Sequence, residues 1–204
     1  MFAFSSNRIT RVTISENVEY IGDGAFGDNP TLERIDVSSD NKNYSSLEGI
    51  LYNKNFSDLC ILPPLNTNKT LVNNVEILRM RSLNGKMLSF HIPPSVKIIN
   101  TNAFFRFQVV NVYFHGSPII MISENTYSIK NIFYLGTIFV DGIFAKTGIE
   151  NVYVYNYYSF STFAGKNVKF MNDDFQIMKP NSCNNKFNIF PNYMNIIPFI
   201  LIYS

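Results

Sequence analysis

Apolar residues near the start of the chain recur at a fixed spacing. Ile9, Val12 and Ile14 are followed by apolar residues at positions 32, 35 and 37, a shift of 23 each time. The last two residues of each set alternate with polar ones, as in a strand with one buried face. A period of this length is typical of a solenoid, in which each turn buries its apolar side only against neighbouring turns. The pattern therefore predicts a stack of turns.

The same unit returns further along the chain. Six residues of the first turn match residues of similar type 78 positions later, without a gap: Val12, Ile14, Val18, Ile21, Ala25 and Phe26 become Phe90, Ile92, Val96, Ile99, Ala103 and Phe104. Each copy predicts a strand followed by a turn that leads back to the core. We therefore expect an α/β or mainly β solenoid with one short parallel strand per turn.

The stretch between the two copies departs from the pattern. It predicts two short strands, Ile50–Tyr52 and Leu59–Leu62, joined by the polar loop Asn53–Asp58. Residues 65–88 are the least regular, with a degenerate turn expected around Val75–Leu78. We expect the solenoid to span residues 1–171, and a C-terminal tail or degenerate cap to span 172–204.

Shorter turns continue through the second half of the chain. Asparagine precedes each expected strand there, in steps of 20, 20 and 16 residues, at Asn111, Asn131, Asn151 and Asn167. An aromatic residue precedes each restart, in the role of Phe26: Phe104, Tyr127, Phe144 and Phe163. These segments are interpreted as shorter turns of the same solenoid.

Two segments resemble the BspA-like, or treponemal-type, leucine-rich repeats found in surface proteins of bacteria and parasitic protists. Val18–Phe26 and Ile92–Phe104 are similar to the family's IP-x-S-V-x-x-I-G-x-x-A-F core, and Asn43–Tyr52 resembles a variant turn of that family. Family repeats often carry a cysteine shortly after Ala-Phe, where this chain has Asn29 and Phe107. The resemblance implies a leucine-rich-repeat-like right-handed superhelix that serves as a binding or adhesion module, with no cofactor and no catalytic machinery.

The strand register predicts which side chains the sheet turns away from the core. If the flanking apolar residues face inward, the residues between them form a row on the other face. We interpret this row as a ligand-binding stripe consisting of Asp36, His91, Tyr113, Phe133 and Tyr153. Adjacent aromatic members would lie ~4.8 Å apart and form an exposed ribbon.

Two structural interpretations of the row compete with binding. The rings could stabilise the sheet by stacking on one another, or reflect a compositional bias toward aromatic residues and asparagine. The four asparagines would form a second row, interpreted as a structural amide ladder. If the ribbon is exposed, Phe133→Ala should leave the melting temperature almost unchanged.

Charge and reactive residues exclude several function classes. The net charge is +2 with no basic stripe, so we expect no nucleic-acid binding. His91 and His115 have no metal-ligand spacing, and Cys60 and Cys183 are too far apart for an expected disulfide. We therefore expect no enzyme, although a catalytic site within residues 65–88 or the tail stays open as a third hypothesis.

The compartment is left open by the sequence. Asn43, Asn55 and Asn68 begin sequons that would accept glycans on export. The apolar stretch Ile189–Tyr203 is interrupted by prolines and is too short to span a bilayer, so we expect a strand or cap there. The first hypothesis is a surface module that binds a protein or glycan through its parallel sheet. The alternative is an intracellular scaffold for protein interactions, which would be cytoplasmic if the chain is complete.

Overall fold

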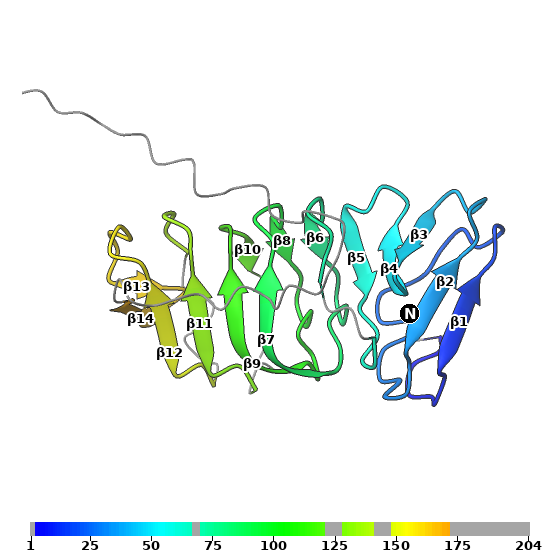
Figure 1. Ribbon diagram of the computed structural model, residues 1–204, viewed down its shortest axis with the longest axis horizontal. Helices are drawn as coiled ribbons and strands as arrows, with labels where there is room; N and C mark the ends of the chain where they lie inside the picture. The colour runs from blue at the N-terminus through cyan, green and yellow to red at the C-terminus, as the bar shows by residue number, and fades with distance from the viewer. Residues whose placement is uncertain (1–2, 67–69, 121–127, 141–147, 172–204) are drawn as a thin grey trace, which may run out of the picture. The chain divides into compact units, whose positions relative to one another are not determined.

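A computed structural model describes residues 3–66, 70–120, 128–140 and 148–171. The chain divides into two units, Met1–Asn172 and Asp173–Ser204, and the described residues all belong to the first. These residues form strands and turns without any helix, which confirms the mainly β form of the predicted solenoid (Figure 1). Tyr127, Phe144, Asn68, Cys183 and the tail lie outside the described residues, and the boundary at residue 171 stays a prediction.

The first turns pair as the 23-residue period predicts. Strand β1 (Arg11–Ile14) is parallel to β2 (Arg34–Val37), and Val12 lies opposite Ile35. Ile14 and Ile35 are buried, whereas Arg11 and Arg34 are exposed. The apolar alternation therefore sets the register, because a slip of one residue would turn the buried side chains to solvent.

The variant turn forms an antiparallel meander. It consists of β3 (Tyr44–Leu47), β4 (Ile50–Asn53) and β5 (Asp58–Ile61). The second and third strands were predicted, and the first was not. The β3–β4 connection places Glu48 and Gly49 at φ 51° and 82°, as a tight hairpin requires. A Cβ on Gly49 would approach the Cβ of Arg34 to 2.6 Å, so only glycine fits.

Two further sheets form the rest of the described solenoid. One has the order β13-β14-β12-β11-β9-β7, with strands β7 (Lys86–Ile92), β9 (Gln108–Phe114), β11 (Asn131–Tyr134), β12 (Asn151–Val154), β13 (Thr162–Phe163) and β14 (Lys166–Phe170). The other continues from β3, β4 and β5 through β6 (Ile77–Leu78), β8 (Ile98–Ile99) and β10 (Ile119–Ile120). Short and long strands alternate in chain order from β6 to β11, and Figure 1 draws the short strands above the long ones.

The predicted row of strand residues from Asp36 to Tyr153 does not lie on a single sheet. The strands divide into three sheets, and β2 and β7 belong to different ones. The antiparallel meander lies between β2 and β7 in the sequence and pairs with the short strands instead, which interrupts the ladder. The degenerate turn around Val75–Leu78 is confirmed, because β6 pairs in parallel with both β5 and β8.

The two copies related by 78 positions have the same local structure. Phe26 and Phe104 are both buried, and each closes a turn whose alanine N–H donates to a carbonyl three residues earlier. Gly24 and Asn102, which occupy equivalent positions, have φ values of 67° and 62°. Asparagine tolerates this left-handed conformation, which explains how it replaces glycine in the second copy. The repeat inferred from the sequence is therefore confirmed.

Candidate functional site

The long strands turn one row of rings away from the core. Val112 and Phe114 belong to the core cluster, while Tyr113 between them does not. Tyr113 lies opposite His91 on β7 and Phe133 on β11, and Phe133 lies opposite Tyr153 on β12. The predicted register is therefore confirmed for these four residues, which we call the ring row.

The ring row is a continuous stack. Ring centroids lie 4.5 Å apart between His91 and Tyr113, 4.4 Å between Tyr113 and Phe133, and 5.0 Å between Phe133 and Tyr153. The corresponding planes are within 7°, 9° and 14° of parallel. Because strands in a ladder are ~4.8 Å apart, matched residues on flat strands are forced into face-to-face contact.

The expectation that this ribbon is exposed is wrong for its centre. Tyr113 is 8% exposed and Phe133 is 6% exposed, whereas His91 and Tyr153 are half-buried. Both buried members have a ring stacked on each face, and both half-buried members end the row. Stacking removes both faces of an inner ring from solvent, and the prediction from strand alternation took no account of this effect.

A row of amides runs beside the rings on the same face. The Nδ2 of Asn131 donates to Oδ1 of Asn111 at 2.9 Å, and the Nδ2 of Asn151 donates to Oδ1 of Asn131 at 2.8 Å. The ladder was predicted to include Asn167, but Lys169 of β14 donates to Oδ1 of Asn151 at 2.6 Å instead. Asn167 itself is exposed, and it lies opposite Thr162 where β13 and β14 pair antiparallel over two residues.

Asp36 does not join the ring row. It lies on β2 opposite Thr13, in the separate two-stranded sheet, and its carboxylate pairs with Arg34 of the same strand. The prediction that Asp36 shares a stripe with His91 is wrong, because the sheet is not continuous between β2 and β7.

The two histidines of the chain meet at one end of the ring row. His91 Nδ1 and His115 Nε2 are 2.9 Å apart, so one ring donates a hydrogen bond to the other. Burial lowers the pKa of His91, and burial together with the charge of His91 lowers the pKa of His115 to about 4. Both rings are therefore neutral near pH 7. Across the described ranges, no group of three or more His, Cys, Asp or Glu side chains is arranged to hold a metal ion.

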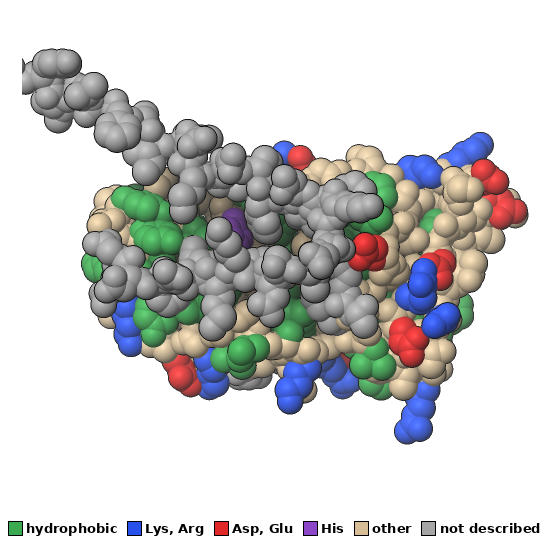
Figure 2. Space-filling model, in the orientation of Figure 1, with side chains coloured by type: hydrophobic (Ala, Val, Ile, Leu, Met, Phe, Trp, Pro, Cys, Tyr) green, Lys and Arg blue, Asp and Glu red, His purple; other side chains and the backbone are tan. Residues whose placement is uncertain are grey.

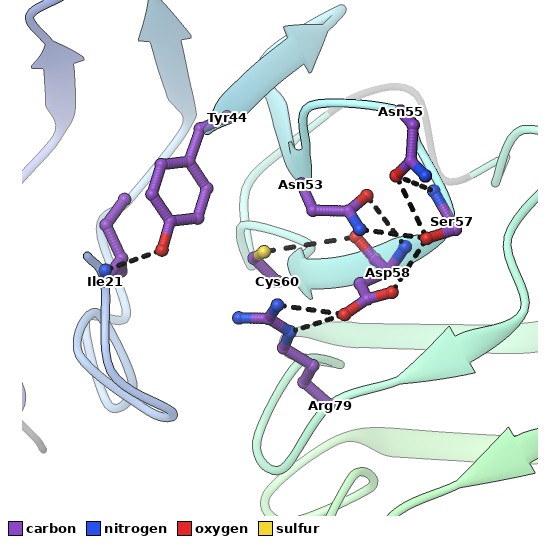
Figure 3. A network of polar contacts seen from close by, with 8 residues as sticks. All are labelled: Ile21, Tyr44, Asn53, Asn55, Ser57, Asp58, Cys60 and Arg79. Carbon is purple, nitrogen blue, oxygen red and sulfur yellow. Dashed lines mark hydrogen bonds and ion pairs between the residues drawn. The ribbon is translucent and has the colours of Figure 1, made fainter. Parts of the chain in front are cut away.

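A polar network holds the variant turn against its neighbours (Figure 3). Arg79 donates to Oδ2 of Asp58 through Nε at 3.1 Å and Nη2 at 2.9 Å, and Ser57 donates to the other carboxylate oxygen. Cys60 lies beside this pair, and burial raises the pKa of its thiol to about 12. A protonated thiol is a poor nucleophile, so Cys60 has the character of a packing residue.

A second aromatic surface was not predicted. It lies on the loops that follow β11 and β12 and consists of Ile138, Phe139, Tyr155, Tyr157 and Phe160, which we call the rim patch. Phe139 and Phe160 lie 5.1 Å apart at 50°, and Tyr155 stacks on Tyr157 at 5.2 Å. Ile138 is 64% exposed, Tyr157 53%, Phe139 44% and Phe160 39%. The sequence signal that could have revealed this surface is a set of apolar residues in segments between strands, where polar residues are usual.

Two of the predicted sequons can be placed. Asn43 and Asn55 are exposed, and the N–H of Lys54 donates to the carbonyl of Asn43 at 2.8 Å, so both lie at one end of the β3–β4 pair. Asn55 Oδ1 accepts a hydrogen bond from the backbone N–H of Ser57 at 3.4 Å. Over the described part of the chain, no helix is long and apolar enough to cross a membrane.

Comparisons with solved structures support the fold. A leucine-rich repeat protein from Eubacterium ventriosum superposes with a TM-score of 0.61 at 22% identity, covering 76% of this chain and 44% of the other. The pneumococcal vaccine antigen PcpA gives 0.54 at 14%, covering 79% and 50%. A leucine rich cell surface protein from Faecalibacterium prausnitzii gives 0.54 at 17%, covering 84% and 50%. The chain thus spans half or less of the length of these proteins.

Sequence comparison identifies the family. A search of the curated proteins finds no match. The family profile described as "BspA type Leucine rich repeat region" matches residues 1–69 and 65–189, with six copies of the repeat. The profile covers most of the chain, including both copies of the unit that recurs after 78 residues. The chain therefore belongs to the BspA-type leucine-rich repeat family.

Proposed function

We propose that the chain is a non-enzymatic adhesion module of a surface protein, and that the sheet face carrying the ring row contacts a protein partner. The observation that carries this proposal is the pair of parallel rows on one flat face, one of rings and one of amides. Such a face offers the half-buried rings of His91 and Tyr153 together with amide hydrogen-bonding groups, as protein interfaces do. The family, together with a vaccine antigen and a cell surface protein among the similar structures, supports the repeat-module role.

The stacking geometry favours a protein over a glycan on this face. Sugars bind aromatic residues by laying C–H groups on a free ring face. In the ring row the faces of Tyr113 and Phe133 are covered by neighbouring rings at 4.4 to 5.0 Å, and the two rings are 8% and 6% exposed, so neither offers a free face to a sugar. The half-buried rings at the ends of the row and the amides beside them suit the side chains and backbone of a polypeptide.

Reactive groups support a non-enzymatic role. The thiol of Cys60 stays protonated because burial raises its pKa to about 12. The two histidines are hydrogen-bonded to each other, and Asp58 is paired with Arg79. Each of these groups takes part in the packing or hydrogen bonding of the fold.

The binding proposal is tested on two arrays, one of purified extracellular proteins and one of glycans. We expect signals on the protein array only, and at least tenfold weaker binding for the double variant Tyr153→Ala, Lys169→Ala, which alters the accessible end of the ring row. The matched control is Tyr20→Ala, whose ring is exposed elsewhere. Signals on the glycan array alone, or equal binding by both variants, would overturn the proposal.

The compartment is tested separately on the native protein. Mass spectrometry should find glycans on Asn43 or Asn55 where the host glycosylates exported proteins, and intact cells should label at the surface. Unmodified asparagines together with labelling only after lysis would instead support the intracellular scaffold.

A further inference from the structure

The rim patch is built from two consecutive turns that are tied together. The hydroxyl of Tyr157 donates to the carbonyl of Leu135 at 3.3 Å, which joins the loop after β12 to the loop after β11. Phe139 and Phe160 make the second contact between the same loops. In Figure 2, hydrophobic side chains gather beside β12, whereas acidic and basic ones gather over β1 and β2. The two loops that carry the patch are thus joined by two contacts.

Two buried tyrosines hold these loops in place from below. The hydroxyl of Tyr134 donates to the carbonyl of Ile138, and that of Tyr158 donates to the carbonyl of Thr162, each at 2.9 Å. Burial raises the pKa of both tyrosines, so the hydroxyls remain protonated donors. Gly136 leaves room for the Tyr134 hydroxyl, which a Cβ at that position would meet. The exposed rings are therefore presented by a preorganised support, which lowers the entropy lost on binding.

The loops have the composition of a recognition surface. Residues 155–161 have the sequence Tyr-Asn-Tyr-Tyr-Ser-Phe-Ser, and neither they nor residues 135–140 include a charged side chain. The preceding loop, residues 115–118, contributes only His115, which is neutral because its pKa is about 4. Tyrosine, serine and asparagine dominate the binding loops of antibodies because they combine large contact area with adaptable hydrogen bonding. Charge complementarity therefore calls for an uncharged partner surface.

We propose that the rim patch is a second binding surface, separate from the sheet face, that takes an uncharged, apolar segment of a partner protein. Ile138 is its most exposed member and favours a polypeptide over a glycan, because an aliphatic side chain offers sugar hydroxyls nothing. Phe139 and Phe160 are inclined at 50°, unlike the nearly parallel ring row, and so leave ring surface free for a partner side chain. Clustered apolar exposure of this kind marks interaction sites.

The test uses a random peptide library displayed on phage and panned against the immobilised full chain. We expect enriched peptides to be apolar and uncharged, and a synthetic peptide of the enriched sequence to bind at least tenfold more weakly to the double variant Phe139→Ser, Phe160→Ser. Thermal melting should show that this variant is folded. The matched control, Tyr20→Ser, should bind the peptide as the unaltered chain does.

Two further results separate this surface from the sheet face. The double variant Tyr153→Ala, Lys169→Ala should bind the enriched peptide as strongly as the unaltered chain does. Peptide binding to the rim patch is therefore measured independently of the protein array, and it stands even if the sheet-face proposal fails there. Enrichment of charged peptides, equal binding by the Phe139/Phe160 and Tyr20 variants, or a glycan signal that disappears with the Phe139/Phe160 variant would overturn the proposal.

Discussion

The ring row and the rim patch use the same residue types and differ in what surrounds each ring. Tyr113 and Phe133 on matched strand positions are buried between parallel neighbours, whereas Phe139 and Phe160 on loops are tilted and exposed. Strands keep their register from turn to turn, so equivalent rings are brought face to face. Loop lengths differ between turns, so loop rings do not align. Matched strand positions therefore cover the inner rings of the ring row, whereas the rings of the rim patch stay exposed.

The largest expected effect is on the ring row. Phe133→Ala should lower the free energy of unfolding by ~3 kcal/mol, because it removes a buried ring and two stacking contacts. Phe104→Ala in the core is the reference, with an expected loss of ~3–5 kcal/mol. Chemical denaturation of both variants measures the difference. An unchanged midpoint for Phe133→Ala would show that the row is exposed, as alternation alone had suggested.

The second largest expected effect is a loss of folding stability in acid, at the histidine end of the ring row. The pKa of His115 is lowered to about 4 in the folded chain, below its ordinary value near 6.5. Stability is therefore complete above pH ~6.5 and is lost as the pH falls toward 4, because the unfolded chain binds the proton more readily. The full shift corresponds to about 3 kcal/mol, and partial exposure reduces the expected loss to roughly 1–2 kcal/mol.

The measurement is the unfolding midpoint between pH 7 and pH 4, with His115→Gln as the comparison. The variant should lose part of the pH dependence in this window. A profile identical to that of the unaltered chain would contradict the role of the histidine pair.

The amide ladder should contribute less. Asn131→Ala removes the residue that both donates to Asn111 and accepts from Asn151, and water can replace part of each bond on this half-buried face. We expect a loss of ~1 kcal/mol by denaturation. Asn167→Ala, at the equivalent repeat position outside the ladder, should cost less than ~0.5 kcal/mol. Equal losses at both sites would show that the ladder adds nothing beyond ordinary surface asparagines.

The smallest stability effect should come from the rim patch. Phe160→Ala should change the free energy of unfolding by ~0.5 kcal/mol or less, because the residue is 39% exposed and its removal opens to solvent instead of leaving a closed cavity. Thermal melting beside Phe133→Ala provides the contrast. A loss as large as that of Phe133→Ala would mean that the rim rings support the fold, and the distinction between the two surfaces would fail.

Periodicity in the sequence was sufficient for the repeat and for the inward residues. The match between Phe26 and Phe104 identified equivalent core positions, and the alternation around Tyr113 and Phe133 identified the face they occupy. The break in the sheet was harder to foresee. The segment Tyr44–Ile61 pairs antiparallel with itself, and only its long-range partners show that it separates Asp36 from His91.

The order of residues was enough to predict the family, the stack of turns and the direction in which each strand residue points, because these depend on local spacing and on burial of apolar side chains. How exposed those residues are, and which of them meet, follows only from the packing of the turns. The burial of Phe133, the contact between His91 and His115, and the joining of two loops through Tyr157 all arise between turns 20 or more residues apart. Such contacts depend on the distance between stacked turns and on loop length, which no single turn encodes.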